Sequence, residues 1–419
     1  MRKTLLIILI LFASQSFAQK NVKVNVFYQG YEPEEPSIYI NPLNPDNIIA
    51  GANIDNYYYS FDAGKTWGEG KLPGPIVWGD PVLHFDYLGN AYFTHLGTFT
   101  NTGIYISKSS DGGRTWGNSK RIYGFTGRKP FQDKEWIVSD HTSSQYKGNL
   151  YVSWTEFDEY DSENPDDSSR ILFSMSNNQG QSFTEPVVIS DRGGSAKDGD
   201  NAVEGAVPSV GPNGEIYIAW SGSRGIEFNK SLDGGATFSE DMWITDQVGG
   251  WSYDIPGLYR CNGLPFTACD ISGGDYNGNV YINFSDSRNG DHDIFIVRSS
   301  DGGDSWSDVI RVNDDAVGNG KEQFMSHFCV DPVTGVMYVL YYDRRNYNDL
   351  KTDVYLAISR DGGLTFTNER ISDTPFVPKS KVLFGDYIGI NAYNNFYSAI
   401  WMRMDDGILS IMNYSNTLQ

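Results

Sequence analysis

Short apolar segments separated by tight-turn sequences run along most of the 419-residue chain, and long stretches with helical periodicity are absent. The stretch 206–246 shows the unit clearly. Apolar segments at 206–210 and 216–220 flank the turn sequence GPNG, and two further segments follow at 226–229 and 242–245. Segments of this length, bounded by Gly, Pro and Asn, predict β-strands joined by hairpins. The pattern therefore predicts an all-β chain built from repeated four-strand units.

An eight-residue motif, Ser-x-Asp-x-Gly-x-Thr/Ser-Trp/Phe, marks these units. Its six copies begin at Ser60, Ser109, Ser176, Ser231, Ser299 and Ser359. The short carboxylate can accept hydrogen bonds from its own turn, the glycine permits a positive φ, and the aromatic residue can be buried. The third copy has Asn178 in place of Asp, which keeps an acceptor but loses the charge. Recurrence at a fixed period indicates a repeat architecture, and we expect all six copies to be structural turns.

The motif resembles the Asp-box, or bacterial neuraminidase repeat, of the sialidase superfamily. The segments DKEW (133–136), YYDRRN (341–346) and FGDYIGI (384–390) also resemble parts of secreted bacterial proteins described as sialidase-like. The resemblance implies a β-propeller with the Asp-boxes on the face opposite the binding site. It implies a fold and a place for the site, and leaves the activity open.

The number of blades follows from counting the units. Complete units fall near 36–72, 80–123, 134–190, 206–246, 266–312 and 323–372. The tail adds three strands, at 385–390, 396–402 and 408–414, with no Asp-box and no fourth strand. The alternating segment 22–28 can supply the missing outer strand by pairing with the last one, which removes the exposed edges of an open sheet. We therefore predict seven blades, with six as the alternative.

The N-terminus has the pattern of a secretory signal peptide. Arg2 and Lys3 precede an apolar run, and Ser16 and Ala18 supply small residues before Gln19. We expect a signal peptide over 1–18, a single propeller domain over 19–419, and a secreted or periplasmic protein. No other apolar run approaches the length of about 20 residues that spans a bilayer. The formal net charge of −21 argues against nucleic acid or an anionic membrane as a partner, and we expect a monomer.

Three cysteines bear on stability and metal binding. Cys261 and Cys269 lie close together in a loop-like stretch, and an exported chain meets oxidising conditions, so we predict that they form a disulfide. Cys329 lies in an apolar run and should be a buried free thiol. No Cys/His spacing suggests zinc, and we expect neither a metal nor a cofactor.

Candidate functional residues gather in two kinds of loop, those that lead into first strands and those that join second to third strands. In a propeller both kinds lie on one face. Candidates for catalysis are Asp133, Glu135 and Tyr387, and candidates for substrate binding are Asp80, Lys134, Trp136, Arg224, Arg288, His327, Arg344 and Asp386. Glu204 also stands at a strand start. Together they predict a polar funnel for an anionic or neutral glycan, in which arginines bind a carboxylate or sulfate and Trp136 or Tyr387 stacks on a sugar ring. The alternative is that the Asp-x-Arg sequences only brace neighbouring loops.

Three functions remain open from the sequence. The first is a glycan-active enzyme, either a hydrolase with a carboxylate pair or a lyase with Tyr387 or His327 beside Arg288 or Arg344. The second is a non-catalytic propeller that binds glycan or protein. The third is a sialidase, for which the resemblance implies three arginines, a Tyr nucleophile paired with Glu, and an Asp acid/base. The segment at 35–39, EPSIY, stands where that family has Arg-Ile-Pro, and it contains no arginine.

Overall fold

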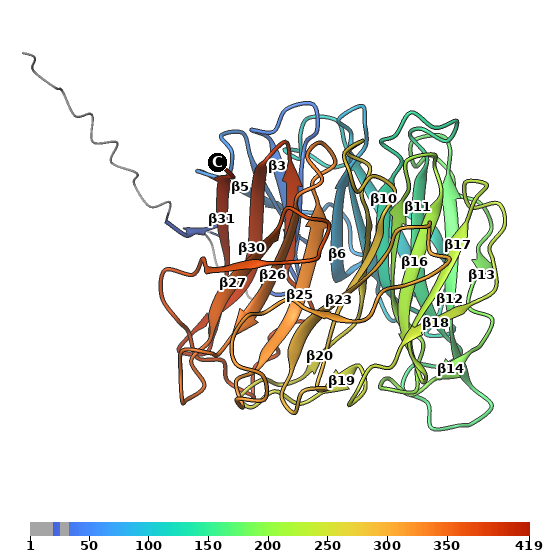
Figure 1. Ribbon diagram of the computed structural model, residues 1–419. Coiled ribbons are helices and arrows are strands. Elements are labelled where there is room, and N and C mark those ends of the chain that lie inside the picture. The colour runs from blue at the N-terminus through green and yellow to red at the C-terminus, as the bar shows by residue number, and fades with distance from the viewer. Residues whose placement is uncertain (1–19, 26–32) are drawn as a thin grey trace, which may run out of the picture.

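A computed structural model describes residues 20–25 and 33–419, and in these residues the secondary structure consists of strands without helices. Seven antiparallel sheets, six of four strands and one of five, surround a central axis, which makes the protein a seven-bladed β-propeller (Figure 1). The predicted fold class and blade number are therefore confirmed. No helix in the described part of the chain is long and apolar enough to cross a membrane.

The blades follow one another along the chain, and each runs from an inner to an outer strand. Blade 1 consists of β2 (Ser37–Ile40), β3 (Ile48–Ala52), β4 (Asn56–Ser60) and β5 (Gly68–Lys71), and blade 2 of β6 (Val77–Phe85), β7 (Ala91–Gly97), β8 (Gly103–Ser109) and β9 (Lys120–Gly124). Blade 3 consists of β10 (Phe131–Ser139), β11 (Leu150–Phe157), β12 (Ser168–Ser176) and β13 (Val187–Val188), with β14 (Gly194–Ser195) also paired to β12. Blade 4 consists of β15 (Glu204–Val210), β16 (Ile216–Gly222), β17 (Gly225–Ser231) and β18 (Met242–Thr245).

The second half of the ring repeats the plan. Blade 5 consists of β21 (Phe266–Cys269), β22 (Val280–Asp286), β23 (Asp293–Ser299) and β24 (Ile310–Arg311), and blade 6 of β25 (Gln323–Val330), β26 (Met337–Asp343), β27 (Asp353–Ser359) and β28 (Thr367–Arg370). Blade 7 consists of β29 (Gly389–Tyr393), β30 (Phe396–Asp405), β31 (Ile408–Thr417) and β1 (Val22–Lys23). A short hairpin of β19 (Ser252–Tyr253) and β20 (Cys261–Asn262) precedes blade 5 and lies at the lower end of the ring in Figure 1.

The two ends of the described chain close the ring. Val22 stands opposite Asn413 and Lys23 opposite Met412, so β1 is the outer strand of a blade whose other strands come from the C-terminal tail. The predicted pairing of the N-terminal strand is confirmed for these residues. Residues 26–28 of the predicted strand and the predicted signal peptide at 1–18 lie outside the described residues.

The Asp-boxes are structural turns between third and fourth strands. In the second copy, Asp111 accepts hydrogen bonds from the backbone N–H (3.0 Å) and the hydroxyl (2.6 Å) of Thr115. Ser109 Oγ accepts from the N–H of Gly113 at 3.1 Å, where φ is 87°. In the third copy Asn178 makes equivalent contacts, accepting from the Ser182 N–H (3.0 Å) and donating to its hydroxyl (2.8 Å). The amide therefore substitutes for the carboxylate, as predicted.

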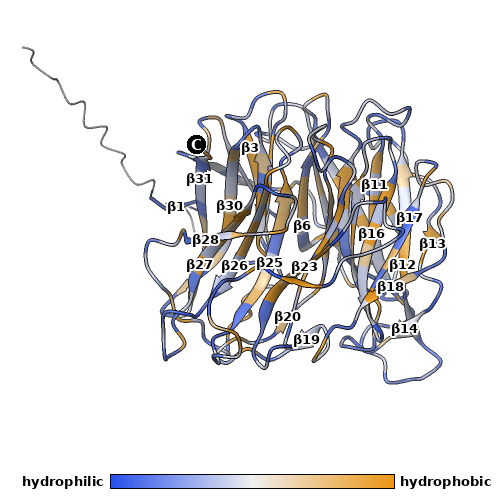
Figure 2. Cartoon of the chain, viewed as in Figure 1, coloured by the Kyte–Doolittle hydropathy of each residue, from blue (hydrophilic) through white to orange (hydrophobic). Residues whose placement is uncertain are grey.

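The hydrophobic core lies between adjacent blades. Tyr151 and Phe173 of blade 3, for example, are in one buried cluster with Ile216 and Trp220 of blade 4. Figure 2 shows the apolar residues along the strands and the polar residues mainly in the connecting loops. Packing between sheets therefore fixes the arrangement of the inner strands around the axis.

Four aromatic side chains close the central channel part-way along its length. The ring centroid of Trp136 lies 5.2 Å from Phe266 and 5.7 Å from both His327 and Tyr387. We call these four residues the plug. They come from the inner strands of blades 3, 5 and 6 and from the segment before β29 of blade 7. The plug lies between a cavity at the end where the inner strands begin and another where they end.

The predicted disulfide is wrong, because Cys261 and Cys269 are both free buried thiols. Cys261 belongs to β20, beside the cavity at the start of the inner strands. Cys269 is the last residue of β21, and this extended strand carries it to the cavity at the other end of the channel. Cys329 is also free, but it is partly rather than fully buried.

Candidate functional site

A cavity of about 350 Å³ opens at the end of the channel where the inner strands begin. We call it the funnel. Consecutive antiparallel strands alternate direction, so the funnel lies opposite the Asp-boxes, which connect third to fourth strands. Its ionisable lining includes Glu35, Asp80, Asp133, Lys134, Tyr160, Asp198, Glu204, Arg260 and Asp386. These side chains come from the starts of inner strands in five blades and from neighbouring loops.

A repeated backbone feature places these side chains. The inner strands of five blades have a positive φ near their start, at Glu35 (55°), Asp80 (55°), Lys134 (50°), Gly205 (77°) and Met325 (52°). In blades 2, 3 and 6 the pairing register shifts next to this residue, as at a β-bulge. Bulges redirect side chains and occur near active sites. In blades 2 and 3 the residues at the bulge, Asp80, Asp133 and Lys134, line the funnel, and Trp136 after it lies in the plug.

Asp386 is the centre of an ion-pair network in the funnel. Lys134 Nζ lies 2.5 Å from Asp386 Oδ2, and Arg260 donates to both carboxylate oxygens, at 2.9 and 2.5 Å. Lys134 Nζ also lies 3.5 Å from Asp80 Oδ2. Burial alone would raise the pKa of Asp386, but the charges of Lys134 and Arg260 outweigh it and lower the pKa. Asp386 is therefore a carboxylate at neutral pH.

Asp133 has the opposite protonation behaviour in the same cavity. Asp133 is 8% exposed. Burial and the charge of Asp80 raise its pKa to about 8, although the positive charge of Lys134 acts to lower it. Burial and the charge of Asp198 likewise raise the pKa of Glu204 well above its ordinary value. The funnel thus holds protonated carboxylic acids beside an ionised carboxylate at neutral pH.

Glu35 and Arg260 belong to the site but were not selected from the sequence. Glu35 accepts hydrogen bonds from Asn53 Nδ2 (2.8 Å) and from the backbone N–H of Asp386 (3.1 Å). The repeated pattern of an acidic residue before proline, at Glu35-Pro36 and Asp80-Pro81, could have revealed it. Arg260 lies in the long connection before blade 5, outside the repeated units, and no motif marks it.

An arc of aromatic side chains forms one side of the funnel. Trp78 and Phe99 are 43% and 41% exposed, and their ring centroids lie 4.8 Å apart. Phe99 stacks on Phe131 at 5.8 Å, and Phe131 lies 4.8 Å from Tyr160. We call these four residues the aromatic arc. Exposed rings beside a polar cavity suit contact with the apolar face of a sugar ring.

Comparisons with known proteins agree with this fold. Residues 58–67 match the BNR/Asp-box repeat family. The chain is an Asp-box β-propeller. It combines this repeat with seven blades. No curated protein sequence resembles the chain closely enough to count as a match.

Solved structures share the propeller at low sequence identity. A protein of unknown function from Dyadobacter fermentans is similar with a TM-score of 0.53 and 13% identity, over 96% of this chain and 98% of the other. An ulvan lyase, from a new family of polysaccharide lyases, gives a TM-score of 0.51 and 14% identity, over 94% and 95%. An α-L-arabinofuranosidase from Fusarium graminearum gives 0.51 and 11%, over 96% and 98%. At these identities the likeness establishes the fold alone.

The propeller brings most of the predicted strand-start residues together. Asp80, Asp133, Lys134 and Asp386 line the funnel, and Trp136, His327 and Tyr387 lie beneath it in the plug. His327 accepts a hydrogen bond from the N–H of Ile390, and burial lowers its pKa to about 3. It is therefore a neutral packing residue.

Glu135 and Tyr387 line a smaller cavity of about 30 Å³ next to the funnel. Glu135 is 1% exposed, and neither carboxyl oxygen hydrogen bonds to another described residue. Burial, together with the charge of Asp80, raises its pKa well above the ordinary value. The Tyr387 hydroxyl donates to the carbonyl of Pro81 at 3.1 Å, and burial raises its pKa as well. No hydrogen bond joins these two residues, so the Tyr/Glu arrangement implied by the sialidase resemblance is not formed.

The three predicted arginines do not line the funnel. Arg224 is paired with Glu227 at 3.0 Å, and Arg288 with Asp286 at 2.6 Å. Arg344 donates to the carbonyl of Pro256 at 2.7 Å. These contacts match the alternative in which arginines brace loops, and the predicted lyase pairing of Tyr387 or His327 with Arg288 or Arg344 is not assembled.

Proposed function

We propose that the protein is a glycoside hydrolase that binds a neutral glycan in the funnel, with Asp133 as the proton donor. The observation that carries the proposal is that Asp133 and the ionised Asp386 network share one cavity beside an exposed aromatic arc. Carboxyl groups whose surroundings separate their pKa values are the usual basis of acid/base assignments, and glycoside hydrolysis uses two of them.

Asp80 is the proposed second catalytic carboxylate. Both oxygens of Asp386 are occupied by Arg260 and Lys134, so Asp386 holds these cations in place. Asp80 has the longer contact to Lys134, at 3.5 Å, and its backbone N–H is fixed by Asn53 at 2.8 Å. It would serve as nucleophile or as the base that activates water.

The charge balance of the funnel favours a neutral substrate. Seven carboxyl groups line it, and its two strongly basic side chains, Lys134 and Arg260, are both bound to Asp386. A carboxylate or sulfate on the ligand would therefore find no free cation there, whereas sugar hydroxyls can donate to carboxylates. The arabinofuranosidase from Fusarium graminearum supports the idea that a propeller of this kind can host glycosidase chemistry.

The proposal includes export. The charged and apolar pattern of residues 1–18 supports secretion to the periplasm or the medium, where extended glycans are found. N-terminal sequencing of the protein recovered from those fractions would test this, with Gln19 as the expected first residue. A first residue at Met1 would contradict it.

The activity is tested by incubating the protein with a panel of neutral and acidic polysaccharides and measuring new reducing ends. We expect cleavage of a neutral member, and Asp133→Asn should lower the rate by about 100-fold or more. Asp308→Asn, at an exposed surface position, is the matched control and should leave the rate unchanged. Binding of a neutral glycan without cleavage would favour the non-catalytic propeller, and cleavage confined to acidic members would contradict the proposed substrate class.

A further inference from the structure

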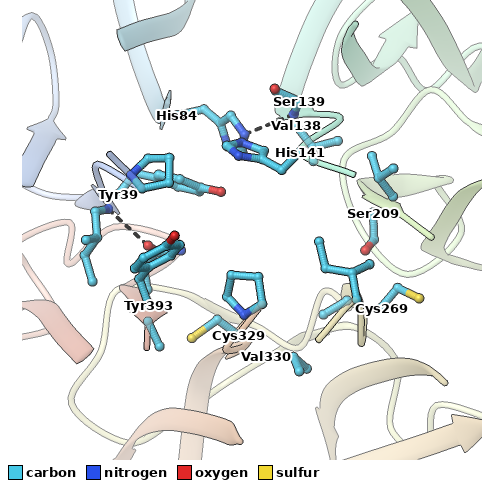
Figure 3. Close-up of a pocket in the computed structure, with 18 of the residues that line it drawn as sticks. Tyr39, His84, Val138, Ser139, His141, Ser209, Cys269, Cys329, Val330 and Tyr393 are labelled. Carbon is cyan, nitrogen blue, oxygen red and sulfur yellow. Dashed lines mark hydrogen bonds between the residues drawn. The ribbon is translucent and has the colours of Figure 1, made fainter. Parts of the chain in front are cut away.

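A second cavity, of about 530 Å³, occupies the other end of the channel (Figure 3). We call it the exit cavity. Trp136, Phe266 and His327 of the plug form its floor, so it is separate from the funnel. No Asp or Glu is among its lining residues, although the chain carries a formal charge of −21. Its one charged lining residue, Lys147, places its ammonium over the ring of Tyr87 at 4.7 Å.

Two histidines at the edge of the exit cavity have opposite tautomers. His84 Nε2 accepts a hydrogen bond from the backbone N–H of Ser139 at 3.0 Å, so the proton of its neutral ring is on Nδ1. His141 Nε2 contacts the carbonyl of Phe85 at 2.8 Å and must donate, so its Nδ1 is unprotonated. Burial lowers the pKa of both rings, which keeps them neutral at ordinary pH.

The two Nδ1 atoms form a donor and an acceptor without partners. No described residue hydrogen bonds to either of them, and His84 is 4% exposed. The ring centroids of His84 and His141 lie 5.6 Å apart, and Figure 3 shows the two rings next to each other. A single hydroxyl group can accept from one nitrogen and donate to the other.

The rest of the exit cavity has somewhat more apolar than polar lining, and Ser209 and Thr267 are among its polar residues. Tyr39 contacts His84 with a centroid distance of 4.1 Å, and Val138, Val330 and Ile390 are among the aliphatic lining residues. A ligand with many hydroxyls, such as a sugar, would leave most of them unpaired against these side chains, which is costly. An apolar ring with one hydroxyl fits both the lining and the histidine pair.

We propose that the exit cavity binds a neutral, mainly apolar ring that carries one hydroxyl group, of which phenol is the simplest example. The hydroxyl accepts from His84 Nδ1–H and donates to His141 Nδ1, and the ring lies against the aliphatic wall. This site is independent of the proposed hydrolase activity, because it lies on the opposite side of the plug.

Isothermal titration calorimetry with phenol, toluene and glucose tests the proposal on the unmodified protein. We expect phenol to bind with one site per chain, and toluene, which has no hydroxyl, to bind about 100-fold more weakly, as expected for two lost hydrogen bonds. Glucose should not bind in this cavity. The proposal would be overturned if phenol did not bind, or if phenol and toluene bound with equal affinity. It would also be overturned if glucose bound more tightly than phenol and the Ser209→Phe substitution, described below, abolished that binding.

Two variants locate the site. Ser209→Phe, which places a phenyl ring in the exit cavity, should abolish binding of both aromatic probes, and His141→Phe should weaken phenol about tenfold while leaving toluene unchanged. Trp78→Ala, in the funnel, is the matched control and should bind phenol as the unmodified protein does. Phenol binding that survives Ser209→Phe would place the ligand elsewhere and overturn the proposal. If His141→Phe fails to fold, the ratio of phenol to toluene affinity in the unmodified protein and the effect of Ser209→Phe still test the proposal.

Discussion

Lys134 and Asp386 are 252 residues apart in the chain, yet Lys134 Nζ lies 2.5 Å from Asp386 Oδ2. Lys134 belongs to the innermost strand of blade 3, and Asp386 directly precedes that of blade 7. Their ion pair therefore joins distant blades across the channel. Both residues also line the funnel. The ion pair that joins the two blades therefore also fixes the position of two side chains in the site.

Lys134→Met should destabilise the protein by about 3 kcal/mol at neutral pH, because it leaves buried carboxylates without their cation. Arg260 still holds Asp386, but Asp80 loses its partner. Urea unfolding followed by tryptophan fluorescence measures the change. Lys65→Met, at an exposed position, is the control and should lie within about 0.5 kcal/mol of the unmodified protein. Equal stability of both variants would show that the network does not stabilise the ring.

The stability of the protein should fall as the pH rises from about 4 to 8. The pKa of Asp133 is about 8 in the folded protein and about 4 in an unfolded chain, so the folded state binds the extra proton in this window. Asp133→Asn has no proton to lose and should show a smaller loss of stability between pH 5 and pH 8.5. The difference should be about 1.4 kcal/mol for each unit of pKa shift removed. Urea unfolding at the two pH values measures this loss. The same loss of stability in both proteins would contradict the assignment.

Trp78→Ala should weaken binding of the neutral glycan about fivefold, which corresponds to about 1 kcal/mol for a lost ring contact. Folding should be little affected, because the side chain is 43% exposed. Leu88→Ala, at a comparably exposed position in the loop between β6 and β7, is the matched control and should keep full affinity. If titration showed the same loss for both variants, or for neither, the aromatic arc would not be the sugar contact.

Asp111→Asn should be almost neutral, whereas Asp111→Ala should cost about 2 kcal/mol. The reason is visible in the third Asp-box, where Asn178 keeps both contacts to Ser182. An amide can accept from the Thr115 N–H and donate to its hydroxyl, but alanine can do neither. Chemical denaturation of the two variants compares them directly. A loss of similar size in both would show that the charge, and not the hydrogen bonding, is required.

Titration of the unfolded, unreduced protein with a thiol reagent should find three thiols per chain, one for each cysteine. Cys261 and Cys269 lie at different cavities, so they cannot be joined without moving β21. Cys329→Ser is a useful check and should reduce the number to two. A single thiol in the unmodified protein would restore the disulfide that the sequence suggested.

The fold was predictable because its signals are local and repeated. Each Asp-box turn is made by residues within a few positions, and the missing outer strand of the tail indicated closure by residues near Val22. The strand-start residues of the funnel, such as Asp80 and Asp386, followed from the alternation of strand direction.

The contacts that the sequence did not predict depend on how far apart side chains lie in the folded protein. Arg288 follows Asp286 by two positions, and its guanidinium donates hydrogen bonds to the Asp286 carboxylate. The guanidinium is therefore not free to bind a ligand. Arg260 reaches Asp386 from a connection without repeats, so no pattern announces it. Cys261 and Cys269 are only eight positions apart in sequence, but β21 is extended and separates them.

The closure of blade 7 also sets an order of events during synthesis. Val22 and Lys23 emerge from the ribosome early, but their partners, Met412 and Asn413, emerge almost four hundred residues later. Until then six blades can form, while the seventh has only its outer strand, β1. A nascent chain that stops short of β31 therefore stays an unclosed ring with free sheet edges, which other chains can pair with.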